Sequence, residues 1–88
     1  MSSAISLNDE VRWILGRPNF WCYGVAQVLR EDGHDIPSKA EEEQAAVIHW
    51  LLNIYLEHGD KWRDVAQQET ARIKANVEAR IAKRAETA

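Results

Sequence analysis

Residues 38–57 carry the stretch that decides the fold, SKAEEEQAAVIHWLLNIYLE. Ser38 with Glu41 three residues later matches the capping box, in which each side chain bonds a backbone amide at a helix start. The glutamates that follow complement the positive end of a helix dipole. Gly59 supplies a helix stop just beyond the stretch. The pattern predicts a helix from about Ser38 to about Glu57.

The apolar residues of this helix cover a wide arc of its surface. At about 100° per residue, the arc spans roughly 200°. Its members are Gln44, Val47, Ile48, Leu51, Ile54 and Tyr55, widened by Ala45, Leu52 and Leu56. A helix this apolar is buried on several sides, so we expect it to be the central helix. It is also a candidate for contact with a second subunit, although an interior helix of a monomer would show the same arc.

Three further helices are expected around the central one. Apolar residues recur with helical spacing, and no segment alternates apolar and polar residues long enough to predict a strand. The expected ranges are residues 7–15, residues 20–31 and about residue 61 to the C-terminus. Their ends are placed by Ser6 with Asp9, Gly16, Asn19, Gly33 and Asp60. The predicted fold class is all-α, a small bundle of about four helices with a long C-terminal helix.

The second expected helix has one strongly apolar face. Trp21, Val25, Val28 and Leu29 share it, and we expect this face to pack against the core. Gly24 within the same helix indicates a close crossing of two helices.

Length and composition limit the class of protein. Eighty-eight residues make one helical domain, 1–88, in which residues 1–5 are expected to be disordered and about 84–88 frayed. The formal net charge of −3 disfavours nucleic acid as the main partner. The single cysteine and the lack of a signal-peptide or membrane-span pattern predict a cytoplasmic protein that does not enter a membrane.

The last helix has features that favour self-association. Some 25 residues would span roughly 37 Å, more than the diameter of about 30 Å expected for a compact domain of this size. Either the end of the helix frays, or the helix projects and docks on another chain. Residues 1–60 hold four Lys plus Arg against ten Asp plus Glu, whereas residues 61–88 hold seven against four. Parts of unlike charge favour contact with each other, within one chain or between two. The predicted oligomer interface consists of Leu52, Leu56, Trp62, Ile73, Val77 and Ile81.

Several aromatic residues fall outside the expected buried faces. Trp13, Phe20 and Tyr23 lie more than about 120° from the apolar faces of their helices, so we expect them to be partly exposed. Tryptophan, tyrosine and arginine dominate the energy of many interfaces. We therefore predict a binding surface, named here the arginine–aromatic surface, formed by Arg12, Trp13, Arg17, Asn19, Phe20 and Tyr23. Possible secondary contacts are Lys39, His49 and Trp50. The alternative is that this surface only packs one helix on the next.

Motifs of known catalytic and metal sites are missing from the sequence. It has no glycine-rich phosphate loop and no nucleophile motif of the hydrolase type. Catalysis would need Cys22 with one of His34, His49 or His58, and nothing in their spacing demands such a pair. A zinc site from the same residues lacks a ligand pair one helical turn apart. We therefore expect no enzyme activity, no metal and no cofactor.

Several short stretches carry a resemblance to a known group of proteins. They are LGRPNF (15–20), LREDGHDI (29–36), KAE (39–41), EQA (43–45), VIHWLL (47–52) and HGDKWR (58–63). The chain resembles, over roughly residues 5–75, a group of small uncharacterised proteins encoded by bacteriophages and prophages of proteobacteria. The resemblance implies a phage context, in which small proteins often bind and occlude host factors, including CRISPR and other defences, or sequester nucleotide signals. It assigns no catalytic residue.

Two functions of different classes follow from these observations. The first is a helical, self-associating protein that blocks a host protein through the arginine–aromatic surface. The second is an oligomeric sponge for a nucleotide second messenger, with phosphates held by Arg12, Arg17 and Lys39 and bases stacked on Trp13, Phe20 or Tyr23. A third possibility is a structural or regulatory helper of the phage.

Overall fold

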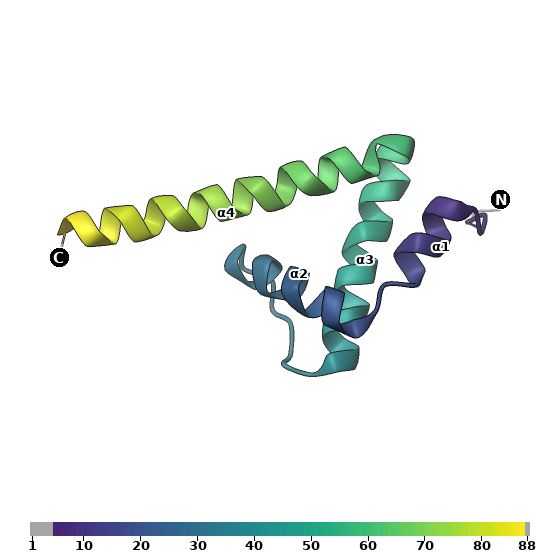
Figure 1. Ribbon diagram of the computed structural model, residues 1–88, viewed down its shortest axis with the longest axis horizontal. Helices are drawn as coiled ribbons and strands as arrows, with labels where there is room; N and C mark the ends of the chain where they lie inside the picture. The colour runs from purple at the N-terminus through teal and green to yellow at the C-terminus, as the bar shows by residue number, and fades with distance from the viewer. Residues whose placement is uncertain (1–4, 88) are drawn as a thin grey trace.

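The computed structural model describes residues 5–87, and every regular element in this range is a helix. In chain order the elements are α1 (Asp9–Leu15), α2 (Asn19–Glu31), α3 (Ala40–His58), the short 3₁₀ helix η1 (Gly59–Lys61) and α4 (Trp62–Thr87), as Figure 1 shows. The predicted all-α class is therefore confirmed. No helix in this range is both long and apolar enough to cross a membrane. The predicted disorder at residues 1–5 and fraying at 84–88 fall partly on residues 1–4 and 88, which lie outside the described range.

The expected number of about four helices needs a small correction. Because α3, η1 and α4 follow one another without a non-helical residue, the described residues form three uninterrupted helical stretches. The chain nevertheless turns sharply at η1, where Gly59 adopts a φ of 59° that favours glycine. As a result, α3 and α4 point in different directions and pack as separate helices (Figure 1).

α3 is the central helix, as its wide apolar arc predicted. It contacts α1, α2, η1 and α4. Val47, Leu51 and Ile54 are buried on one face, and their spacing of four and three residues keeps them together. At the edge of the arc, Leu56 is left exposed.

The buried face of α2 coincides with the expected one only at Leu29. Cys22, Ala26 and Leu29 are buried, whereas the predicted Trp21, Val25 and Val28 are only half-buried. The two sets lie roughly 100° apart around the helix axis. Small side chains at positions 22 and 26 let the axis of α2 approach α3 closely, because interaxial distance depends on the side chains at the contact. The larger apolar residues are left beside this contact.

One ion pair fixes the connection between α2 and α3. Arg30 Nη2 lies 2.9 Å from Glu43 Oε2, and Glu43 is the one polar residue among the described residues that is fully buried. The Arg30 guanidinium also donates to the carbonyl oxygens of Ile36, at 3.0 and 2.9 Å, and Pro37, at 3.1 Å. Arg30 thereby holds the loop after Gly33 against the start of α3.

The predicted helix caps are mostly wrong. The expected caps Ser6, Asn19 and Ser38 are replaced by Asn8, Pro18 and Lys39. Asn8 alone among these three makes a side-chain capping bond, in which its Oδ1 accepts from the Val11 amide at 2.9 Å. Gly16 has a φ of −88° and is not the left-handed stop expected, whereas Gly33, with a φ of 93°, is.

α4 extends beyond the other helices, as the alternative of a projecting helix predicted. Its 26 residues correspond to about 39 Å. The described chain measures 55 × 28 × 23 Å and has a radius of gyration of 15.2 Å, compared with about 12 Å for a compact chain of this length. Arg72 pairs with Asp32 at 3.2 Å, and Arg80 donates to the Glu31 carbonyl at 3.2 Å. These contacts tie the middle of α4 to the end of α2, and the last turns project past them (Figure 1).

The Arg30–Glu43 pair gives a direct test of this fold. Glu43→Ala leaves the half-buried Arg30 without its carboxylate, and we expect the free energy of unfolding to fall by about 2 kcal/mol. Thermal unfolding followed by circular dichroism should show the midpoint lowered by roughly 8–16 °C. Glu42→Ala, one position earlier and exposed, is the control and should unfold like the parent chain. Equal midpoints for Glu43→Ala and the parent would contradict the role of the pair.

Candidate functional site

A groove of about 440 Å³ opens between α2 and α4. We call it the tryptophan groove, because all four tryptophans of the chain line it. Its lining residues are Trp13 from α1, Trp21, Gly24, Val25 and Val28 from α2, Trp50 and Leu51 from α3, and Trp62, Arg63, Ala66, Gln67, Thr70 and Lys74 from α4. The larger apolar residues of α2 lie beside its buried face and contribute to this lining.

Three of the tryptophans touch one another at one end of the groove. The Trp13 ring meets Trp21 edge to face, with centroids 5.5 Å apart and planes at 87°. It also meets Trp62 at 5.6 Å and 46°. Trp62 is 2% exposed and belongs to the core, while Trp13, Trp21 and Trp50 are half-buried. The groove is therefore lined by indole surface that the fold leaves partly open to solvent.

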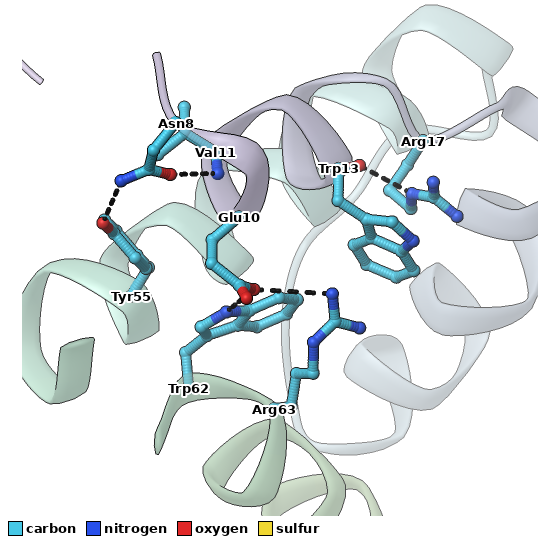
Figure 2. A network of polar contacts seen from close by, with 8 residues as sticks. All are labelled: Asn8, Glu10, Val11, Trp13, Arg17, Tyr55, Trp62 and Arg63. Carbon is cyan, nitrogen blue, oxygen red and sulfur yellow. Dashed lines mark hydrogen bonds and ion pairs between the residues drawn. The ribbon is translucent and has the colours of Figure 1, made fainter. Parts of the chain in front are cut away.

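Polar contacts hold α1, and with it Trp13, at this end of the groove (Figure 2). Glu10 Oε2 accepts a hydrogen bond from Trp62 Nε1 at 2.7 Å and lies 3.4 Å from Arg63 Nη2. Asn8 Nδ2 donates to the Tyr55 hydroxyl at 2.9 Å. α1 is thus joined to both α3 and α4 by side chains, although it has only seven residues.

Two arginines stack on the tryptophan rings. The Arg17 guanidinium carbon lies 3.4 Å from the Trp13 ring centroid, and Arg17 Nε donates to the Trp13 carbonyl at 2.8 Å. The Arg63 guanidinium carbon lies 4.7 Å from the Trp13 centroid and 4.6 Å from that of Trp62. These cation–π contacts stabilise the cluster and place positive charge beside it.

The groove carries positive charge in an acidic protein. Arg63 and Lys74 line it, and no Asp or Glu is among the described residues that do. The chain as a whole has a net charge of −3. Gln67 and Thr70, which lie between the two cations on α4, are uncharged. The groove therefore offers an apolar surface with two cations along one edge.

The structure divides the arginine–aromatic surface into two parts. Phe20 is 81% exposed and Tyr23 is 56% exposed, as expected, and Arg12 and Asn19 are also exposed. Trp13 and Arg17 are half-buried and packed against each other, as the alternative interpretation of helix packing proposed. Of the six predicted residues, only Trp13 also lines the tryptophan groove. A binding role for the other five stays a prediction.

The other predicted contact residues have different positions. Trp50 lines the groove, Lys39 is exposed at the start of α3, and His49 is exposed with its ring 3.1 Å from Asn53 Nδ2. The predicted oligomer interface is wrong at Trp62 and Ile73, because each is 2% exposed and lies in the core of its own chain. The remaining members have surface to offer: Leu52 and Val77 are half-buried, and Leu56 and Ile81 are exposed.

The titratable residues show no catalytic arrangement. Cys22 is fully buried in the core, and burial raises the pKa of its thiol, with the Arg17 charge acting in the opposite direction. A thiol held in its protonated form is a poor nucleophile. In the part of the chain that is described, no three His, Cys, Asp or Glu side chains gather to hold a metal ion.

Comparison with known proteins adds no relative: no protein-family model, curated protein sequence or solved structure matches this chain. The resemblance to small phage proteins is not tested by these comparisons and stays a prediction.

The groove could not be predicted from the sequence, for a reason visible in α2. Trp21, Gly24, Val25 and Val28 follow the spacing of one helix face, and Cys22, Ala26 and Leu29 follow that of another. Hydrophobicity favours the first face as the core, because its side chains are larger. The signal that distinguishes the faces is size, since Cys and Ala permit the closer helix contact.

The stacked arginine provides a test of which predicted residues are structural. Arg17→Ala removes the cation–π contact and the bond to the Trp13 carbonyl, so the free energy of unfolding should fall by about 1–2 kcal/mol. Phe20→Ala, which removes an exposed ring, should change it by less than about 0.5 kcal/mol. Urea unfolding of both variants measures the difference. If the two variants were equally stable, Arg17 would not be holding α1 in place.

Proposed function

We propose that this chain is a non-enzymatic binding protein that blocks a host factor by holding a segment of it in the tryptophan groove. The observation that carries the proposal is that all four tryptophans line one open groove of about 440 Å³. Small domains have few large apolar residues to spare, and burial is their main source of stability. Leaving three indoles half-buried forgoes some of that stability, which a function at the groove would account for.

The chemistry of the groove supports binding of a protein segment. Tryptophan and arginine are the residues most enriched at binding hot spots, because each offers large contact area with a polar group and little lost flexibility. Arg63 presents both features, since it stacks on two indoles while its guanidinium stays half-exposed. A groove held in shape before binding also reduces the ordering cost of association.

The nature of the partner comes from the resemblance to phage proteins. That resemblance implies a bacterial host factor, and a defence system is the class we propose, in the manner of an anti-CRISPR inhibitor acting by contact alone. Inhibition of this kind needs no catalytic group, because covering the working surface of the target is sufficient.

A nucleotide ligand is the second candidate, favoured by the combination of aromatic and cationic groups in one groove. The residues involved would be Arg63, Lys74 and the tryptophans, in place of the predicted Arg12 and Lys39, which do not line it. The Trp13 ring has Arg17, Trp21 and Trp62 packed around it, and Trp62 is buried, so base stacking would fall to Trp21 and Trp50. Calorimetry with cyclic nucleotides distinguishes this candidate from the first.

Two variants of α2 test the proposed function. The tagged chain is used to isolate its host partner, and the complex is then reconstituted from the two purified proteins. Trp21→Ala removes part of the groove lining and should weaken the reconstituted complex at least tenfold, equivalent to about 1.4 kcal/mol. Tyr23→Ala removes an exposed ring outside the groove and should leave the affinity unchanged. The reverse result would assign binding to the arginine–aromatic surface, and heat from a cyclic nucleotide with no reconstituted complex would favour the sponge.

Self-association also stays part of the proposal, at a different surface. Leu56 and Ile81 are exposed apolar residues, and Val77 precedes Ile81 by one turn on the projecting end of α4. Light scattering at micromolar concentration should therefore give a mass above that of the single 10.1 kDa chain. Ile81→Lys should restore the single-chain mass by placing a charge in the contact. A parent chain that scatters as a monomer would remove this part of the proposal.

A further inference from the structure

Gly24 is a residue that the fold of the single chain does not explain. It lies in the middle of α2, where glycine is among the least favourable residues for a helix. A Cβ atom added there would meet nothing within 4 Å, and its φ is not one that L residues avoid. The close helix crossing predicted from the sequence is therefore not made at Gly24 within this chain. The open space that a Cβ would occupy belongs to the tryptophan groove.

The opposite side of the groove is also built to admit another backbone. Ala66 and Thr70, one turn apart on α4, present small side chains to the groove, while indoles from Trp21 and Trp50 provide its apolar contact area. Glycine allows the backbone of a ligand to come closer than any other residue does. The groove thus has small residues on both sides and large aromatic rings beside them. Such a surface fits a helix whose backbone packs closely on the small residues and whose side chains lie between the rings.

The length of the groove and its charge further limit the kind of ligand that it can hold. Along α4 the lining residues run from Trp62 to Lys74, a distance of roughly 18 Å, which equals about three turns of a helix. Arg63 and Lys74 lie eleven residues apart in the sequence, and eleven residues complete very nearly three turns, so both point to the same side. Lys74 has no ion pair among the described residues. Arg63 Nη2 lies 3.4 Å from Glu10 Oε2, which also accepts the hydrogen bond from Trp62. Two cations so placed complement carboxylates near both ends of a docked helix.

We infer that the occupant of the tryptophan groove is an acidic amphipathic helix of about three turns from a partner protein. Its backbone packs against Gly24, its apolar side chains contact the indoles, and its carboxylates pair with Arg63 and Lys74. This inference rests on the proposed function, since it names the chemistry of the segment that the groove holds.

The probe for this inference is a pair of synthetic peptides. Each is a capped helix of about 14 residues without tryptophan, with leucine and phenylalanine on one face. One peptide carries glutamate beside that face, and its twin carries lysine at the same positions. Because every tryptophan of the chain lines the groove, its intrinsic fluorescence reports occupancy directly. We expect saturable binding of the glutamate peptide and at least tenfold weaker binding of the lysine peptide.

Gly24→Ala separates binding from folding. The substitution replaces a poor helix residue without a clash, so the midpoint of thermal unfolding should rise by several degrees, in the range of roughly 4–8 °C. The added methyl group stands where the peptide backbone packs, so affinity for the glutamate peptide should fall about tenfold. Gln27→Ala, on the exposed face of the same helix, is the control and should leave the affinity unchanged. Full affinity in the more stable Gly24→Ala chain would overturn the close packing at this position.

Two neighbouring glutamines test the charge. Gln67 lines the groove, and Gln68 is exposed and excluded from it, about 100° further round the helix. Gln67→Glu should weaken the glutamate peptide severalfold and strengthen the lysine peptide, while Gln68→Glu should change neither, although both variants carry the same added charge.

The outcomes distinguish this inference from the proposed function. If neither peptide binds and the reconstituted host complex still depends on Trp21, the acidic helix is wrong and the protein-binding groove stands. Preference for the lysine peptide, or a concentration-dependent dimer abolished by Gly24→Ala, would also overturn the acidic helix. Heat from a cyclic nucleotide in place of either peptide would overturn both.

Discussion

The rest of the structure depends on the close contact between α2 and α3. Cys22 and Ala26 of α2 are fully buried, and side chains this small allow two packed helices to come close together. Trp21, Val25 and Val28 lie beside this buried face, are half-buried, and line the groove together with residues of α4. Which face of α2 is buried therefore determines both the core and the groove. Enlarging the residues of the contact would move α2 away from α3 and change both together.

The second constraint is the way α1 is held. Seven residues form too short a helix to be stable alone, and α1 buries only Val11 and Ile14. Its position is secured by the hydrogen bond that Glu10 accepts from Trp62, by the one that Asn8 donates to Tyr55, and by the stacking of Arg17 on Trp13 (Figure 2). Two of the six residues of the arginine–aromatic surface, Trp13 and Arg17, thus stabilise the end of the groove. The other four residues, Arg12, Asn19, Phe20 and Tyr23, are exposed and do not line the groove.

The helices, and the central position of α3 among them, could be predicted from the sequence. The wide arc on residues 40–58 and the breaks at Gly33 and Gly59 are local signals, so the order and approximate bounds of the helices could be predicted. The groove could not, because it depends on which of two apolar faces of α2 packs on α3. Capping was also mispredicted: a polar residue near a helix start, such as Ser38, does not fix the cap when a neighbouring position satisfies the geometry equally well.

The charge distribution indicates how the groove would select what it binds. Residues 1–60 are strongly acidic, so the chain as a whole repels an acidic segment at a distance. Salt screens such repulsion beyond about 8 Å at physiological ionic strength, whereas Arg63 and Lys74 act at contact range beside desolvating indoles. Attraction is therefore felt only by a segment that already fits between α2 and α4. A binding site of this kind gains little from electrostatic steering and discriminates through how long a fitted segment stays bound.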